Sequence, residues 1–158
     1  MRVLGSNHEA SIDSILDSGE LSINDRIIWR QREGHLKARV PVLHSEHRGI
    51  VLELTFLPIV ARFSLQLRFD SIPARRFCSR SPHTMPHDCL ENPGQRIDGY
   101  HKHRWSDITG DECCYVPDDI SISSLEQTFY DFCAESSITF NGIWSDPPPA
   151  QIGLEAVG

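Results

Sequence analysis

Alternation between apolar and polar residues in one short segment is the feature that most constrains the fold of this chain. In residues 62–70 the apolar side chains occupy every second position, so an extended strand would turn them all to one face. Similar β-prone runs fill residues 26–80 and are separated by short turns, which leave no room for the crossover helices that parallel strands require. We therefore expect an antiparallel sheet of about four or five strands with one apolar and one solvated face.

Two segments that flank the predicted sheet have the apolar spacing of helices. Residues 7–19 offer Asn7 as an N-cap and place apolar residues at helical intervals. Residues 121–135 offer Ser121 or Ser123 as an N-cap and contain one apolar stripe. We expect a single α+β domain in which this N-terminal helix and this C-terminal helix pack on one face of the sheet. The residues expected in the shared core are Leu65, Leu67, Phe129 and Phe132.

Length and composition predict one compact domain. A chain of 158 residues with 39% hydrophobic residues can build a core without crosslinks, and we place that domain at residues 1–145. Residues 146–158 contain three consecutive prolines and should form an extended or mobile tail. The sequence has no apolar run long enough for a membrane span, and its first residues lack the apolar core of a secretory signal. We therefore expect a cytoplasmic protein with no membrane partner.

The cysteines favour reduced thiols. Their number is five, which is odd, and Cys113 and Cys114 are adjacent. This pattern fits poorly with a disulfide framework, so the sequence predicts that the cysteines are unpaired.

Charge is distributed unevenly along the chain. Residues 1–104 contain all 15 lysines and arginines and 12 acidic residues, whereas residues 105–158 contain no basic residue and 10 acidic ones. The acidic part either pairs with the basic sheet or provides a surface for a basic partner.

Half of the eight histidines lie in residues 81–105, a segment rich in proline and glycine. These turn-forming residues exclude long regular elements, so the segment is predicted to be a long loop. Loops of this length are usually functional or disordered. Three interpretations remain open for the histidines: an ordinary polar surface, a metal site or an acid–base site.

A metal site is favoured by the spacing of His101 and His103, which are two residues apart and would point the same way on a strand. A histidine from earlier in the segment would supply a third ligand, and Asp88 or Cys89 a fourth, as in a zinc site. The alternative is that the pair lies on a solvated strand face. The predicted metal ligands are His83, His87, His101 and His103.

The motifs "PHTMP", "DGYHKHRW" and "YDFCAESSI" resemble a family of small uncharacterised bacterial and phage proteins that are often associated with mobile elements. That family has a histidine before an Asn-Pro-like turn, then Gly-x-His-x-His, then a helix with Phe-Cys. The chain departs from the family at Met85, where a polar residue is usual, and after Trp105. The resemblance implies a phage or mobile-element setting and no particular reaction. The matching residues are His83, Pro86, Gly99, His101, His103, Phe132 and Cys133.

The leading functional interpretation is a binding protein without catalysis. Spaced carboxylates resemble the charge of a phosphate backbone, so the acidic segment can compete with nucleic acid for a basic host protein. Together with the resemblance, this predicts an inhibitor of a host defence complex, in the manner of anti-CRISPR proteins. The predicted partner-binding residues are Trp105, Asp107, Asp111, Glu112, Asp118 and Asp119.

The alternative is a histidine-dependent phosphodiesterase or ribonuclease of the toxin type, with or without a divalent metal. One histidine would act as base, another as acid, and an arginine would stabilise the charge of the transition state. Nucleic acid would then be the substrate. The acidic residues of the last third of the chain disfavour this alternative, because they repel a polyanion. The sequence thus leaves open whether the chain is an enzyme. The catalytic residues under this alternative are His83, His101, His103 and Arg80.

Overall fold

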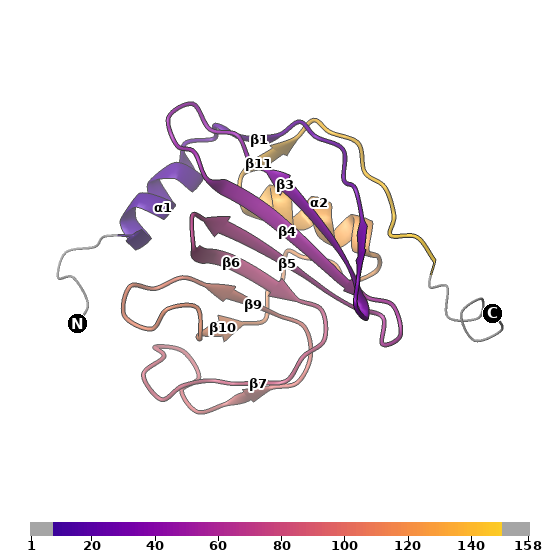
Figure 1. The fold of residues 1–158 in the computed structure, drawn as a ribbon. Helices are drawn as coiled ribbons and strands as arrows, with labels where there is room; N and C mark the ends of the chain where they lie inside the picture. The colour runs from indigo at the N-terminus through magenta and orange to yellow at the C-terminus, as the bar shows by residue number, and fades with distance from the viewer. Residues whose placement is uncertain (1–7, 150–158) are drawn as a thin grey trace.

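A computed structural model describes residues 8–149 of the chain. Its main element is a sheet of seven strands in the order β10-β9-β6-β5-β4-β3-β2, with every neighbouring pair antiparallel (Figure 1). The α+β class and the antiparallel sheet are confirmed, but the sheet has more strands than predicted. The strands are β2 (Arg30–Arg32), β3 (His35–Pro41), β4 (Ile50–Leu57), β5 (Arg62–Phe69), β6 (Ile72–Cys78), β9 (His101–Arg104) and β10 (Cys114–Tyr115).

The alternation in β5 determines the two faces of the sheet. Leu65 and Leu67 are fully buried, as predicted, and the residues between them are partly exposed. Cross-strand register extends the apolar row, because Leu65 pairs with Leu54 on one side and with Phe77 on the other. All three side chains are inaccessible to solvent, so this row forms the centre of the core.

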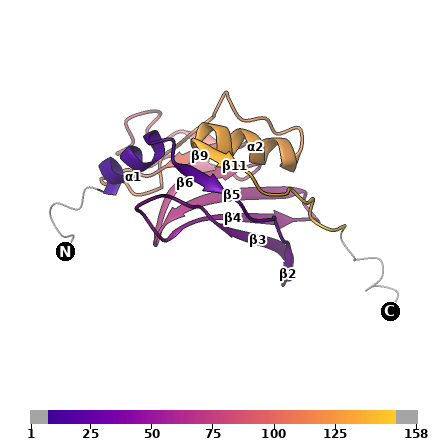
Figure 2. The same cartoon turned by 90° about the horizontal axis from the view of Figure 1, so that it is seen from above.

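Both helices lie on the apolar face of the sheet (Figure 2). Helix α1 (His8–Asp17) buries Ile12 and Leu16, and helix α2 (Leu125–Glu135) buries Phe129 and Phe132, as predicted. All four side chains belong to one core cluster with the sheet.

The N-cap of α2 is Ser124, whose hydroxyl accepts a hydrogen bond from the backbone N–H of Gln127. The prediction of Ser121 or Ser123 was therefore wrong by one to three positions. The backbone carbonyl of Ser121 instead accepts a hydrogen bond from the Thr128 hydroxyl, which keeps it outside the helix. The predicted cap of the first helix, Asn7, lies outside the described residues.

A small parallel pair joins the two ends of the described chain. Strand β1 (Leu21–Ile23) pairs with β11 (Ile138–Phe140) beside the helices. The indole N–H of Trp29 donates to the carbonyl of Ser145 at 2.8 Å, which holds the segment after β11 in place. Residues 146–149 form no helix or strand, and the rest of the predicted tail lies outside the described residues.

No helix of the described chain covers the opposite face of the sheet (Figure 2). Alternate strand residues on this face are mostly polar, and Glu53 lies among them. Its carboxylate pairs with Arg68 at 2.7 Å and with Lys37 at 3.6 Å. The cations on this face include Arg30, Lys37, Arg39, Arg62, Arg68 and Arg76.

The histidine-rich segment is more ordered than predicted. It contains a short hairpin of β7 (His83–Thr84) and β8 (Arg96–Ile97), and it ends in β9, which is a strand of the main sheet. The prediction of one continuous loop was wrong because β9 finds its partner in residues 75–78 of β6, a pairing that local turn signals do not reveal.

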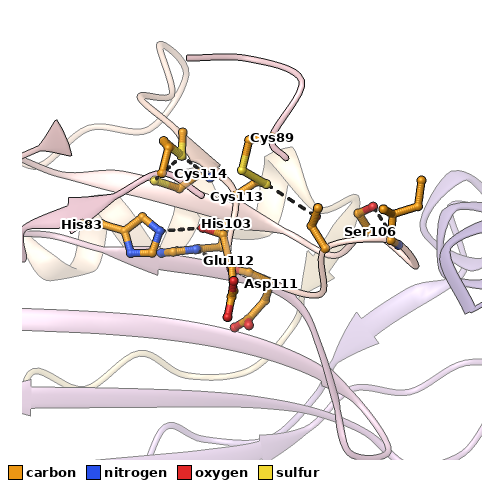
Figure 3. Close-up of a disulfide and its surroundings, with 11 residues drawn as sticks. His83, Cys89, His103, Ser106, Asp111, Glu112, Cys113 and Cys114 are labelled. Carbon is orange, nitrogen blue, oxygen red and sulfur yellow. Dashed lines mark hydrogen bonds between the residues drawn. A yellow bond between two sulfur atoms is a disulfide. The ribbon is translucent and has the colours of Figure 1, made fainter. Parts of the chain in front are cut away.

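Cys89 and Cys113 form a disulfide, so the prediction of reduced thiols was wrong for this pair (Figure 3). Cys78, Cys114 and Cys133 are free thiols. Neighbouring residues of an extended chain point in opposite directions, which lets Cys113 reach Cys89 while Cys114 turns towards Met85. Within residues 8–149 no helix is long and apolar enough to cross a membrane.

Candidate functional site

Three of the four predicted histidines meet on the uncovered face of the sheet. His101 and His103 point the same way from β9, and the β7 hairpin places His83 over both of them. The ring centroid of His103 lies 4.8 Å from each of the other two, and His83 and His101 are 5.7 Å apart. Only 2% of His101 and 1% of His103 is exposed, so the alternative of a solvated strand face was wrong. No described helix lies over these two rings, but His83 of the β7 hairpin packs against both, and the backbone of residues 111–112 contacts His103 and His83.

Each imidazole is fixed by a backbone carbonyl. His83 Nε2 donates to the carbonyl of Glu112 at 2.5 Å (Figure 3), and His101 Nδ1 donates to the carbonyl of Gly99 at 3.1 Å. His103 Nδ1 donates to the carbonyl of Asp111 at 2.6 Å. A carbonyl can only accept, so each of these nitrogens holds the hydrogen, and the other nitrogen of a neutral ring carries a lone pair that can accept a hydrogen bond or bind a metal ion.

Two free thiols complete the cluster. Cys78 is the cross-strand partner of His101, and the ligand atoms of Cys78, His101 and His103 lie within 4.8 Å of one another. Cys114 is the cross-strand partner of His103, and Cys114, His83 and His103 form a second such triad. We call these five side chains the histidine–cysteine cluster. Sequence reasoning missed both thiols because their proximity depends on strand register.

The other predicted ligands lie elsewhere. His87 is exposed and packs against Gly94, and it belongs to neither triad. Asp88 is exposed in the same loop, and Cys89 is bound in the disulfide. The structure therefore brings together His83, His101 and His103 and separates His87 from them.

Arg76 is the arginine that contacts the cluster. Its guanidinium donates to His103 Nε2 at 3.2 Å and pairs with the Asp111 carboxylate at 3.5 Å. Arg80, the arginine predicted for catalysis, is exposed beyond the end of β6.

Burial and charge keep the two central histidines neutral. Burial lowers the pKa of His103 to about 3, and the positive charge of Arg76 adds to this shift. Burial also lowers the pKa of His101. With so low a pKa the ring does not form the imidazolium near neutral pH, and a general acid would need that form, which argues against such a role for His103.

Three of the predicted partner-binding residues hold the fold together. The indole N–H of Trp105 donates to Asp107 at 3.0 Å, and the same carboxylate accepts from the backbone N–H of Glu9 at 3.1 Å. Asp107 therefore stabilises the N-terminus of α1, where a negative charge is favourable. The Asp111 carboxylate is paired with Arg76. Glu112, Asp118 and Asp119 are exposed.

A groove of about 620 Å³ lies beside Trp105. Leu90 and Ile108 line it and are highly exposed, at 101% and 78%. Both residues of the disulfide, Cys89 and Cys113, belong to its lining. The carboxylates that line the groove are Glu9, Asp88 and Glu91.

One basic residue, Arg104, also lines this groove, and its guanidinium lies 3.4 Å from the carboxylate of Asp13. The lining of the groove thus combines exposed apolar side chains with three carboxylates and one guanidinium. Sequence reasoning identified Trp105 but missed Leu90 and Glu91, which line the same groove and follow Cys89 of a disulfide that was not predicted.

Comparison with known proteins found no match to the chain among protein-family models, curated proteins or solved structures. Its possible activities therefore follow from the chemistry of the histidine–cysteine cluster and of the acidic groove.

Proposed function

We propose that this chain is a non-catalytic binding protein that takes up a basic, partly apolar segment of a partner protein in the groove beside Trp105. The observation that supports this is the composition of the groove, whose lining contains exposed Leu90 and Ile108 together with three carboxylates. Exposed apolar side chains with a polar rim are typical of interaction sites. The carboxylates select a partner of positive charge.

The segment that follows Trp105 is negatively charged, like most of the charged side chains that line the groove. Residues 105–149 contain no lysine or arginine, and the exposed carboxylates of Glu112, Asp118 and Asp119 lie in the segment that borders the groove. A field of one sign accelerates the encounter with an oppositely charged partner.

The proposed partner is a basic, nucleic-acid-binding host protein. Carboxylates that occupy a phosphate-binding surface would exclude nucleic acid from it. In the phage or mobile-element setting implied by the resemblance, such a protein would inhibit a host defence complex, as anti-CRISPR proteins do.

A histidine-dependent phosphodiesterase is the second candidate, because the structure gathers His83, His101 and His103 in one place. The burial of His101 and His103 weighs against it, since a polyanionic substrate would have to reach rings that are almost inaccessible. The low pKa of His103 weighs against it as well.

The test measures binding of a host protein, first identified by pull-down and then purified, to the chain and to two charge-reversed variants. Replacing Asp88 and Glu91 with lysine should slow association by about tenfold, and the loss should shrink as salt is raised. The matched control replaces Glu33 and Glu46, two exposed acids outside the groove, with lysine, and its association rate should change less.

Equal effects of the two charge reversals would refute the groove as the binding site. Labelled RNA and single-stranded DNA are incubated with the protein in parallel, with and without a divalent metal. Cleavage that is lost on replacing His83, His101 or His103 with alanine would establish the phosphodiesterase instead.

A further inference from the structure

We propose that the histidine–cysteine cluster is a metal centre that binds one zinc ion, with His103 as the shared ligand and at least one of Cys78 and Cys114 as thiolate. This proposal does not depend on the function of the groove. It rests on the chemistry of the five side chains, on their orientation and on the elements that they connect.

The ligand chemistry is that of zinc. Imidazole nitrogen and thiolate sulfur are the usual ligands of Zn²⁺ in proteins, commonly four in a tetrahedral shell. His103 belongs to both triads, so an ion bound to it lies within reach of two ligands on each side. Small side-chain movements would therefore complete a four-ligand shell around one ion.

The orientation of the rings supports the same conclusion. Each imidazole donates one N–H to a backbone carbonyl, of Glu112, Gly99 or Asp111. In zinc sites such an outer hydrogen bond fixes the ring and leaves the opposite nitrogen as the ligand. Among the described residues, the second nitrogens of His83 and His101 have no hydrogen-bond partner, as ligand positions require.

Arg76 occupies the second nitrogen of His103, which a metal ion would need. The guanidinium has an alternative partner, because the Asp111 carboxylate lies only 3.5 Å away. Metal binding would shift Arg76 fully onto Asp111. A thiol that binds the ion releases its proton to solvent, and the negative charge of the resulting thiolate offsets the remaining positive charge nearby.

The centre would join four different strands. Cys78 ends β6, His83 lies in the β7 hairpin, His101 and His103 lie in β9, and Cys114 lies in β10. An ion held between them would attach the hairpin to the edge of the sheet. The role of the metal would thus be structural, because the ligands are largely buried and the cluster lines none of the three main cavities of the described chain, except for Cys114 at the groove.

The experiment uses the full chain without a histidine tag, handled under inert gas without a reductant so that the free thiols stay reduced and the Cys89–Cys113 disulfide stays intact. Native mass spectrometry with added Zn²⁺ should show one ion per chain. Co²⁺ should give the visible absorption of a tetrahedral site together with a thiolate charge-transfer band. Replacing His103 with alanine should weaken binding by at least about 100-fold, since even outer-shell changes in metal sites cost 10- to 100-fold.

His87→Ala is the matched control, because His87 lies in the same segment but outside both triads. The chain with this substitution should bind Zn²⁺ with unchanged affinity. Cys78→Ser and Cys114→Ser are conservative changes that keep the proposal testable if the His103 variant fails to fold. Loss of the charge-transfer band in one of them identifies the thiolate ligand. The proposal is overturned if Co²⁺ gives no thiolate band, or if the His103 and His87 variants bind Zn²⁺ as tightly as the unaltered chain.

Discussion

Lys102 shows how one residue of the histidine segment serves the opposite face of the sheet. Its neighbours in β9 point into the histidine–cysteine cluster, whereas Lys102 is fully buried against α2. The amine pairs with the carboxylate of Glu135 and lies 5.0 Å from the ring centre of Phe132. Burial lowers the pKa of this amine to about 7, and the positive charge of Arg75 adds to this shift, whereas the carboxylate of Asp119 opposes it.

Replacing Lys102 with alanine should lower the free energy of unfolding by about 3 kcal/mol, because it leaves a cavity and an unpaired carboxylate. Lys102→Met fills the same space with an apolar chain and should cost less than about 1.5 kcal/mol. Urea denaturation of the two variants at neutral pH measures the difference. Equal losses would show that Lys102 contributes through its charge and not through its volume.

At the scale of single residues, the sequence predicted the part of the cluster that depends on local spacing. The separation of His101 and His103 by two positions implied that they share a strand face, and they do. Cys78 and Cys114 could not be predicted, because their proximity to these rings follows from the pairing of β9 with β6 and β10. The role of Asp107 at the start of α1 was hidden for the same reason, since 98 residues separate Asp107 from Glu9.

Secondary-structure elements were predictable where the sequence signal was long. The eight residues of β5 alternate throughout, and the strand and its buried face were both predicted. Strands β9 and β10 have four and two residues and lie among prolines and glycines, so no periodicity marks them. Their partners make them strands, which is why the sheet exceeded the predicted number.

The start of α2 gives a direct test of an element boundary. Ser124→Ala removes the hydroxyl that accepts the N–H of Gln127 and should lower the free energy of unfolding by about 1 kcal/mol. Ser123→Ala is the control, because Ser123 precedes the cap, and it should change stability by less than about 0.5 kcal/mol. Thermal or urea denaturation compares the two. A larger loss in the Ser123 variant would place the functional cap one residue earlier.

Glu53 is the carboxylate that pairs with Lys37 and Arg68 on the uncovered face of the sheet, and its side chain is 11% exposed. Burial raises the pKa of this carboxyl, but the hydrogen bond from Arg68 and the charges of Lys37, Arg68 and Arg39 outweigh it, so the pKa is lowered overall. A carboxyl with a lower pKa in the folded state adds stability above its unfolded value of 4.5, and this stability is lost as pH falls through the folded value.

Glu53→Gln should therefore lower the free energy of unfolding by about 1 to 2 kcal/mol at pH 7, because it leaves clustered cations without their carboxylate. The difference from the unaltered chain should narrow as the pH falls below 4.5, because the Glu53 carboxylate is then protonated and becomes neutral like the glutamine of the variant. Urea denaturation across this range measures it. A difference that stays constant with pH would mean that the carboxylate charge has no part in the stabilisation.

For the whole molecule, the charge difference along the sequence becomes a difference between surfaces. Cations gather on the uncovered sheet face around Glu53, whereas the acidic groove lies at the edge formed by β9, β10 and the loop that contains Cys89. The sequence predicted the imbalance but not the groove, since the disulfide and the strand pairing of β10 bring together lining residues that lie in separate parts of the sequence.

The disulfide is consequently expected to support both the stability of the chain and the shape of the groove. Cys89 and Cys113 are separated by 24 positions, and closing a loop of that length should stabilise the fold by about 3 kcal/mol. Replacing both with serine should lower the midpoint of thermal unfolding and weaken partner binding through faster dissociation, because Leu90 and Glu91, which line the groove next to Cys89, lose their fixed position. Calorimetry and binding kinetics measure the two effects on the same samples.

Cys133→Ser, a change at a buried thiol of α2 outside the groove lining, is the control for stability without a change of groove shape. If the disulfide variant is destabilised but dissociates from the partner at the unaltered rate, the loop that contains Leu90 is not part of the binding surface.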